Sequence, residues 1–166
     1  MYSIFTADLP NVIQNCQIHL YADDTQILKS FSPVDINIAI RDINADLHRI
    51  TMWSQQNGLK INADKSSALF IGTTYILEKS RLYNFSTLHI NNMELPIQDN
   101  ARNLGVIFDA NLNFEKHVLK KISHCYMLLK SLYRFKYVLN ESTKYKIVES
   151  LIFPIIDYCL PVYYPY

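Results

Sequence analysis

The chain has 166 residues, of which 49% are hydrophobic and 19% are charged, so it can build an apolar core and is not a disordered chain. Its 3 glycines and 6 prolines exclude collagen-like and low-complexity classes. No apolar run reaches the roughly 18 residues that span a bilayer, and residues 1–10 lack the basic region of a secretory signal, so we expect no membrane partner.

The net charge of +1 is unevenly distributed along the chain. Residues 1–110 sum to −3, whereas residues 111–166 sum to +4. This division indicates one part that could hold cations and another that could meet a polyanion, although uneven charge is also common on ordinary surfaces.

The three cysteines, Cys16, Cys125 and Cys159, are far apart and lack the spacing of a zinc or redox motif. We expect reduced thiols in an intracellular protein, without a disulfide or zinc, and nothing in the sequence distinguishes nucleus from cytoplasm.

The first predicted elements are a hairpin and a long helix. Apolar Ile18 and Leu20 alternate with polar neighbours, and residues 25–28 favour a strand, so residues 17–28 read as a hairpin around two acids. Ser32 and Pro33 then suit a helix start, and Gly58 suits a helix end. The helix predicted over 34–57 carries apolar residues on one face, at positions 36, 40, 43, 47 and 50.

The middle of the chain predicts further strands. Residues 69–71 read as a buried strand before Gly72, residues 73–84 as a loop, and residues 87–97 as a hairpin that turns at 91–93. Residues 103–109 alternate like another strand, with apolar side chains at Leu104, Val106 and Phe108.

From residue 114 the period becomes helical. A helix is predicted over 114–138, with an apolar stripe at 114, 118, 122, 125, 129 and 132. Another is predicted from Asn140 or Ser142, using Val148, Leu151 and Ile155, and Pro154 should bend or end it. We expect the aromatic tail 161–166 to pack or fray. The fold class is therefore α+β over residues 1–110, followed by a helical part over 111–166.

The sharpest chemical feature is the pair Asp23–Asp24 between two strands. Adjacent carboxylates cannot both enter an apolar core as ions, so they must be solvated, protonated or neutralised by a cation. Hard oxygen ligands suit Mg²⁺, which binds one or two carboxylates together with substrate phosphates. The alternative is a solvated acidic turn, which is commoner for a bare Asp-Asp pair.

The hairpin Tyr21-Ala22-Asp23-Asp24 resembles the catalytic hairpin of reverse transcriptases. Further segments resemble, in order, motifs of non-LTR (LINE-type) retrotransposon reverse transcriptases, and together they cover almost the whole chain. These segments are Phe5–Pro10, Gly58–Ser67, Asn103–Asp109 with Leu112–His117, and Leu151–Cys159.

The resemblance implies a partial polymerase palm over 1–110, with a catalytic β-hairpin, a long helix, a small antiparallel sheet and the primer-grip region, followed by a thumb over 111–166. Asp23 would be the aspartate shared by two Mg²⁺ ions, with Mn²⁺ a possible substitute, and Asp24 its less essential neighbour. Tyr21 would lie near the primer end and the incoming nucleotide, and Lys65 would lie on the loop that protonates the leaving pyrophosphate; the alternative for Lys65 is a solvated loop lysine. Leu104 and Gly105 would shape the primer grip, and the alternative for them is an ordinary strand with a bend at the glycine.

The implied partners are an RNA template, a DNA primer and dNTPs. In the family, the fingers and a first catalytic aspartate precede the hairpin, and only 22 residues precede Asp23 here. We therefore expect a fragment that needs the remaining polymerase segment and does not polymerise alone. We also expect self-association through the sheet edge that the hairpin leaves exposed.

The basic helix 114–138 has six Lys and Arg residues against one acid, with Tyr126, Tyr133 and Tyr137 between them. In a thumb it would follow the phosphates of the template–primer duplex. Without the resemblance, a solvated lysine face is an equal interpretation. The best candidates for backbone contact are Lys116, Lys120, Lys121 and Arg134. The alternatives for the chain are a non-catalytic nucleic-acid-binding remnant and a decayed structural or interaction protein.

Overall fold

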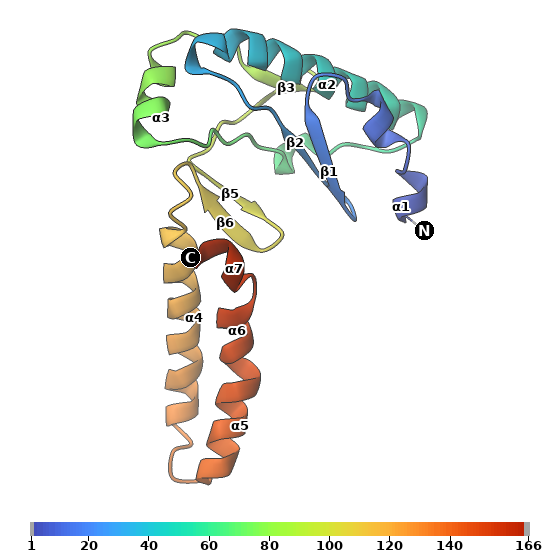
Figure 1. Ribbon diagram of the computed structural model, residues 1–166. Coiled ribbons are helices and arrows are strands. Elements are labelled where there is room, and N and C mark those ends of the chain that lie inside the picture. The colour runs from blue at the N-terminus through green and yellow to red at the C-terminus, as the bar shows by residue number, and fades with distance from the viewer. Residues whose placement is uncertain (1, 165–166) are drawn as a thin grey trace. The chain divides into compact units, whose positions relative to one another are not determined.

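The computed structural model describes residues 2–164 and divides the chain into two compact units, Met1–Asp99 and Asn100–Tyr166 (Figure 1). The first contains α1 (Tyr2–Phe5), η1 (Leu9–Val12), β1 (Gln17–Tyr21), β2 (Asp24–Leu28), η2 (Pro33–Asp35), α2 (Ile36–Gln56), η3 (Ala63–Lys65), α3 (Thr74–Arg81), β3 (Leu88–Ile90) and β4 (Met93–Leu95). The second contains β5 (Asn100–Asn103), β6 (Val106–Asp109), α4 (Glu115–Tyr133), α5 (Glu141–Leu151), α6 (Phe153–Asp157) and α7 (Leu160–Tyr163).

The named strands pair only as antiparallel hairpins over residues 2–164: β1 with β2, β3 with β4, and β5 with β6. Helices and small antiparallel sheets therefore make up the first unit, as the α+β prediction required. The hairpin β5–β6 falls in the same compact unit as the helices, so this unit begins before the predicted boundary at 110/111.

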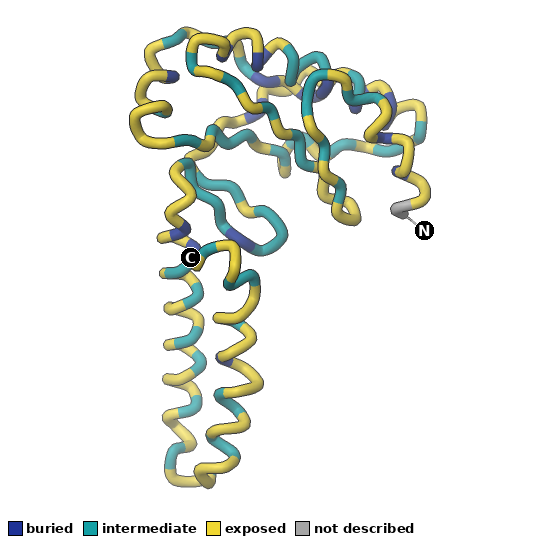
Figure 2. The backbone as a smooth tube through the Cα atoms, in the orientation of Figure 1, coloured by how far each residue is buried: buried dark blue, intermediate teal, exposed yellow. Residues whose placement is uncertain are grey.

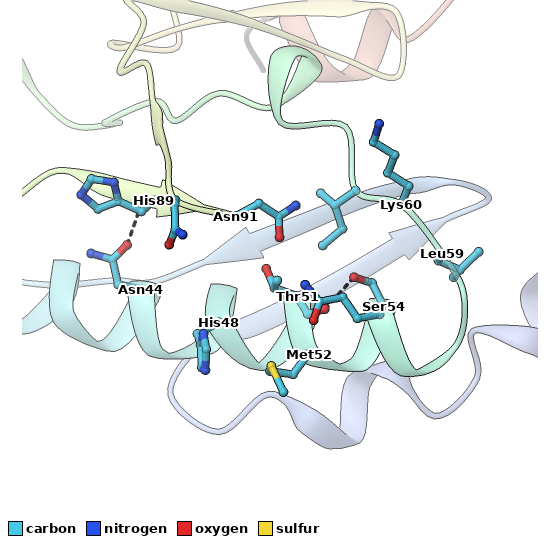
Figure 3. Close-up of a pocket in the computed structure, with 12 residues that line it drawn as sticks. Asn44, His48, Thr51, Met52, Ser54, Leu59, Lys60, His89 and Asn91 are labelled. Atoms are coloured by element: carbon cyan, nitrogen blue, oxygen red, sulfur yellow. Dashed lines mark hydrogen bonds between the residues drawn. The ribbon is translucent and has the colours of Figure 1, made fainter.

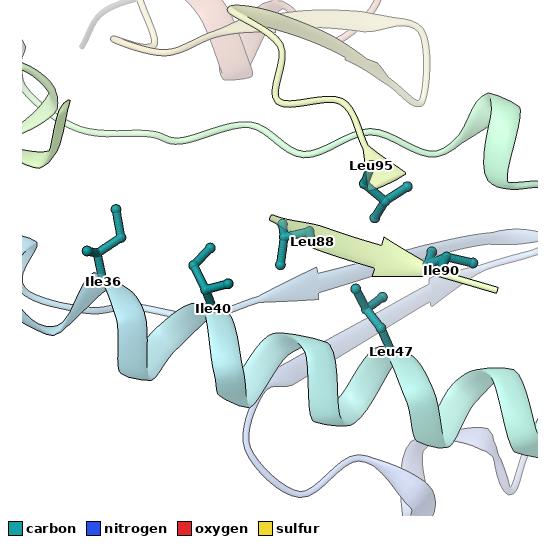
Figure 4. Packing of buried hydrophobic residues seen from close by; sticks show 6 residues of the cluster. All are labelled: Ile36, Ile40, Leu47, Leu88, Ile90 and Leu95. Atoms are coloured by element: carbon teal, nitrogen blue, oxygen red, sulfur yellow. The ribbon is translucent and has the colours of Figure 1, made fainter. Parts of the chain in front are cut away.

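Helix α2 organises the first unit because it is apolar along one side. Its residues Ile36, Ile40 and Leu47 point toward the hairpin β3–β4 (Figure 4). There they pack against Leu88 and Ile90, in a cluster that Leu95 completes. The predicted helix is thus confirmed, although its first residues form the 3-10 turn η2 and the Ser32 side chain makes no cap hydrogen bond.

The other end of α2 packs against the catalytic-hairpin candidate. Ile50 and Trp53 are buried with Leu9 of η1, and Ile18 and Leu20 of β1 pack against them. The Trp53 indole Nε1 donates a hydrogen bond to the Asp8 carboxylate at 3.2 Å. These contacts fix one face of the hairpin β1–β2 on the helix.

Two predictions in the middle of the chain are wrong. Residues 69–71 form no strand; the chain there makes only an isolated bridge between Ala68 and Ile97. The expected loop 73–84 contains α3, because the Thr73 hydroxyl accepts a hydrogen bond from the Ile76 backbone and caps the first turn.

Two hairpins turn through left-handed residue pairs. Asn91 and Asn92 have φ of 51° and 63° and connect β3 to β4, which confirms the second predicted hairpin with shorter strands. Leu104 and Gly105 have φ of 44° and 85° and reverse the chain between β5 and β6. The single strand predicted over 103–109 is therefore wrong, because residues 104–105 are its turn.

The second unit sets α4 beside the α5–α6 segment, with one side of each helix covered and the other exposed (Figure 2). Helix α4 ends at Tyr133 rather than 138, and α5 begins after Asn140, whose side chain accepts a hydrogen bond from the Thr143 backbone at 2.8 Å. Pro154 lies in the first turn of α6. In the helix predicted from Asn140 or Ser142, Leu151 was expected on the apolar side but is exposed, and the neighbouring Ile152 is buried instead. Most of the predicted tail 161–166 forms α7 (Leu160–Tyr163), and its last positions, 165–166, lie outside the described residues.

Candidate functional site

The acidic pair lies at the tip of the hairpin β1–β2, as predicted. Strand pairing joins Tyr21 to Asp24, so Ala22 and Asp23 form a two-residue connection. Ala22 has φ of 52°, a left-handed conformation that costs an alanine about 1 kcal/mol. A strained residue next to Asp23 is typical of sites where side-chain placement matters.

The hairpin has a packed face and an open face because strand side chains alternate. Ile18, Leu20 and Ile27 occupy the packed face against the first unit's core. Tyr21 and Asp24 lie opposite each other on the other face, and the Tyr21 ring is 65% exposed. The apolar residues of the strands therefore turn the aromatic ring and the carboxylate outward together.

Asp23 and Asp24 are exposed, and no described residue gives either carboxylate a hydrogen bond or an ion pair. They offer two hard oxygen donors, which fits part of a Mg²⁺ site. Within residues 2–164 no group of three or more His, Cys, Asp or Glu side chains could hold a metal ion. Further ligands for Mg²⁺ would have to be water, substrate phosphates or another segment.

Lys65 closes the short 3-10 turn η3, and its side chain is exposed. In the described part of the chain it makes no hydrogen bond or ion pair with the hairpin tip. The predicted Tyr21, Asp23 and Asp24 thus share one hairpin end, while Lys65 stands on a separate loop of the same unit.

A buried carboxylate that the sequence analysis missed holds the base of this hairpin. Asp46 is 0% exposed on α2, and its oxygens accept hydrogen bonds from the backbone of Gln14 at 3.1 Å and Asn15 at 2.9 Å. Arg49 pairs with the same carboxylate. Burial opposes its ionisation, but the hydrogen bonds from Asn15, Gln14, Cys16 and Arg49 outweigh burial and lower the pKa of Asp46. The signal available in the sequence was an acid between apolar Ile43 and Leu47 with an arginine three residues later.

The neighbouring groups reinforce this attachment. Lys29, at the end of the hairpin, donates hydrogen bonds to the Asn15 carbonyl at 2.9 Å and to the Asp42 carboxylate at 3.0 Å. Burial, then the hydrogen bond and charge of Asp46, raise the pKa of the Cys16 thiol to about 12, so Cys16 stays protonated. The residues just before β1 and just after β2 are therefore both tied to α2.

A cavity of about 590 Å³, lined by both polar and apolar side chains, borders α2 on the side of the hairpin β3–β4 (Figure 3). Asn44 bridges the two elements there: its amide donates to the Thr87 carbonyl and its oxygen accepts from the His89 backbone, both at 2.9 Å. These hydrogen bonds satisfy the edge of β3, so Asn44 has a structural role.

The predicted primer-grip residues form the turn of the hairpin β5–β6. The Tyr158 hydroxyl donates to the Leu104 carbonyl at 2.7 Å, and a Cβ on Gly105 would lie 3.2 Å from the Tyr158 ring. Gly105 therefore meets two demands, a positive φ and a close approach of the ring.

Asp109 links this hairpin to α4. Its carboxylate accepts hydrogen bonds from the backbone of Asn111, Asn113 and Phe114 just before the helix. Burial works against its ionisation, but these hydrogen bonds outweigh burial and lower the pKa of Asp109.

Helix α4 has three sides. The side facing α5–α6 is half-buried or buried at 114, 118, 121, 125, 128 and 132, so the predicted stripe is wrong at Ile122 and Leu129, which are exposed. An exposed apolar side contains Leu119, Ile122, Tyr126, Leu129 and Tyr133. The basic side contains Lys116, Lys120, Lys130 and Arg134, which follow one another at helical spacing and are exposed.

Lys121 does not belong to the basic side. Its ammonium donates hydrogen bonds to the carbonyls of Ile155 and, at 2.8 Å, Tyr158, and it lies over the rings of Tyr158 and Tyr163. These carbonyls lie at the carboxyl end of α6, where a cation is favourable. This geometry gives Lys121 a structural role, so we leave it out of the proposed phosphate contacts.

Two of the three interleaved tyrosines are also engaged. Lys136 lies over the rings of Tyr133 and Tyr137, at 4.1 and 4.7 Å from their centres. Tyr137 is 89% exposed and Tyr126 is 69% exposed, and Tyr126 is the one of the three whose ring no cation covers among the described residues.

Comparison with curated proteins identifies relatives of this chain. It is 28% identical, over 177 aligned positions that cover 98% of it, to an RNA-directed DNA polymerase from the mobile element jockey of Drosophila funebris. It is 27% identical over 86% of its length to a probable RNA-directed DNA polymerase from the transposon BS of Drosophila melanogaster. The chain resembles mobile-element reverse transcriptases. The resemblance to non-LTR reverse transcriptases that the sequence motifs indicate is therefore confirmed by these two relatives.

The chain spans less than a fifth of the length of these polymerases, at 18% and 16%. No family model matches it, and no solved structure matches it. No helix within residues 2–164 is both long enough and apolar enough to cross a membrane.

Proposed function

We propose that this chain is a section of a mobile-element reverse transcriptase, with palm residues up to 110, the primer grip included, and a thumb from 111. The observation that carries the proposal is the tight hairpin that presents Tyr21, Asp23 and Asp24 outward, in a chain similar to two RNA-directed DNA polymerases.

In the complete enzyme, the primer 3′-hydroxyl attacks the α-phosphate of a dNTP, a new P–O bond forms, and pyrophosphate leaves. Asp23 would hold the metal ions together with a carboxylate from another segment, and Asp24 would assist. Mg²⁺, when bound, stabilises the attacking and leaving oxygens. Tyr21 positions the primer end from the same face as Asp24, and Lys65 gives a proton to the leaving pyrophosphate.

Manganese binding tests the role of the hairpin. In an NMR titration of the 166-residue chain, Mn²⁺ should broaden the amide signals of residues 21–25 first, and Asp23→Asn should remove most of that broadening. Asp35→Asn is the matched control, since Asp35 is an exposed acid elsewhere in the same unit. Equal broadening in the wild type and in Asp23→Asn would contradict the proposal.

The basic side of α4 supports nucleic-acid binding by the thumb. Of its four exposed cations, the three predicted from the sequence, Lys116, Lys120 and Arg134, would meet backbone phosphates. In filter binding with an RNA–DNA hybrid, log affinity should fall against log salt with a slope of about −2 to −3, as three phosphate contacts predict. A flat slope would favour a structural or interaction protein.

The second candidate function is nucleic-acid binding without turnover, which the same basic side favours. Primer extension with Mg²⁺ or Mn²⁺ addresses the catalytic part of the proposal. We expect no Asp23-dependent extension by the 166-residue chain alone, because two exposed carboxylates make a weak metal site. Extension that Asp23→Asn abolishes would show that the chain is complete enough to catalyse.

A further inference from the structure

The second unit contains an open cavity of about 690 Å³ beside α4. Its walls come from the β5–β6 turn, the first half of α4 and the end of α6. The apolar part of the lining includes Leu104, Ile107 and Tyr158. This volume lies in the usual range of small-ligand sites.

His117, one of the residues that line this cavity, carries a buried donor without an acceptor. His117 is only 3% exposed, and its Nδ1 accepts a hydrogen bond from the Ile107 backbone at 3.3 Å. The neutral ring therefore carries its proton on Nε2, because Nδ1 is the acceptor. Nε2 is buried and has no partner among the described residues. A buried N–H without an acceptor destabilises the fold unless a bound group supplies one.

The charges around this donor are of one sign. Arg102 and Lys120 line the cavity with exposed side chains, His124 stands beside them, and no carboxylate contributes to the lining. The Lys121 ammonium is held at the same wall by the carbonyls of Ile155 and Tyr158. Cations that line a concave surface together concentrate anions there.

Burial, then the charges of Lys121 and Lys120, lower the pKa of His117, so the ring stays a neutral donor near pH 7. A neutral N–H beside two free cations suits an oxyanion, because the N–H donates a hydrogen bond while the cations balance the charge.

We propose that this cavity is a phosphate-binding site in which His117, Arg102 and Lys120 receive the oxygens of one phosphate group. The site goes beyond the proposed polymerase function, because it requires neither the acidic hairpin nor a bound duplex, although it shares Lys120 with the basic side of α4. The phosphate could belong to a free anion such as inorganic phosphate or to the 5′ end of a nucleic-acid strand, since both present the same oxygens.

The test is an NMR titration of the 166-residue chain with inorganic phosphate at constant ionic strength, observing the histidine ring nitrogens. The His117 Nε2 signal should shift saturably. Arg102→Gln and Lys120→Gln should each weaken the apparent affinity about tenfold, the size of one charge-assisted hydrogen bond. Lys116→Gln and Lys130→Gln remove the same charge from α4 outside the cavity lining and should change the affinity less than twofold.

Equal losses from the Lys116 and Lys120 variants would overturn the proposal, since binding would then follow overall charge. Absence of a saturable His117 shift would overturn it as well. Arg102 and Lys120 are exposed, so their variants test the site even if a His117→Phe chain fails to fold.

A second arm separates the sources of the phosphate. A 5′-phosphorylated dinucleotide that competes with inorganic phosphate, when its unphosphorylated form does not, supports a strand end as the ligand. Competition by neither form, with inorganic phosphate still bound, supports a free anion. Loss of duplex binding through Lys116→Gln or Arg134→Gln, which lie outside the cavity lining, would leave these results unchanged, so the two proposals fail separately.

Discussion

At the scale of single residues, Ala22 is the most informative position of the hairpin tip. It adopts a positive φ without being glycine, between Tyr21 and Asp23. The local backbone strain is maintained because the strands on either side are paired and packed.

Ala22→Gly should stabilise the first unit by about 0.5 kcal/mol. Relief of the left-handed strain lowers the free energy of the folded state by more than the added conformational entropy lowers that of the unfolded chain. Urea unfolding followed by Trp53 fluorescence measures this change. Ala39→Gly is the control: Ala39 is buried inside α2, and its variant should lose at least about 1 kcal/mol. A destabilised Ala22→Gly chain would refute the strain argument.

Asp46 is a residue whose ionised form supports the fold. Asp46→Asn should cost about 3 kcal/mol, because the backbone donors of Gln14 and Asn15 and the Arg49 guanidinium lose their buried anionic partner. Asp64→Asn, at an exposed position of η3, should change stability by less than about 0.5 kcal/mol.

The same carboxylate makes stability depend on pH. The folded-state pKa of Asp46 lies below its ordinary value of 3.8, so its contribution is complete above about pH 4 and is lost as pH falls through the folded value. Wild-type urea midpoints should therefore fall from pH 4 toward pH 2, and Asp46→Asn should flatten that slope. Parallel slopes for the two chains would contradict this assignment.

At the scale of elements, the hairpin β5–β6 depends on its glycine. Gly105→Ala should destabilise the second unit by about 2 kcal/mol, since the new Cβ meets both a φ of 85° and the Tyr158 ring. Far-ultraviolet circular dichroism during urea unfolding measures the loss. Gly72→Ala, at a glycine whose φ is not positive and whose new Cβ would make ordinary contacts, should cost less than about 0.5 kcal/mol.

Element prediction succeeded where one periodic signal dominated. The spacing from Ile36 to Ile50 determines α2, and strand alternation around Asp23 determines the first hairpin, because each pattern reflects a face that is packed in the fold. The α3 helix escaped prediction because Tyr75 and Ile76 are exposed, so no apolar periodicity marks it, and Thr73 was the only start signal.

The candidate site was predictable where it depends on local sequence. The hairpin tip follows from four adjacent residues, whereas the roles of Lys121 and Asp46 depend on partners distant in the chain. The strand predicted over 103–109 had correct alternation, but alternation alone cannot reveal that the chain reverses at Leu104 and Gly105. The hydrogen bonds of Lys121 and Asp46 join residues that are far apart in the chain, and such pairs leave no periodic pattern in a sequence.

At the scale of the whole molecule, the chain consists of two compact units, and its one tryptophan, Trp53, lies in the first. We expect Trp53 fluorescence to follow unfolding of Met1–Asp99 alone, while circular dichroism follows both units, so the two urea transitions should not coincide. Asp46→Asn should shift the fluorescence transition and leave the helical transition of residues 100–166 in place. If the fluorescence and circular dichroism curves coincide in the wild type and also in Asp46→Asn, the chain unfolds as one cooperative unit.

The buried attachment at Asp46 also has a mechanical consequence. The strand β1 starts at Gln17, just after the clamped residues Gln14 and Asn15, and ends at Tyr21, about 13 Å further along at the rise of a strand. The hairpin is thus a cantilever with its anchor in the helix and its twin acids at the free end, and a tilt of about 5° at the anchor would carry the tip about 1 Å. Displacements of this size separate productive from unproductive alignment in catalysis, so the buried Asp46 carboxylate would determine the position of the two carboxylates for which we propose a catalytic role.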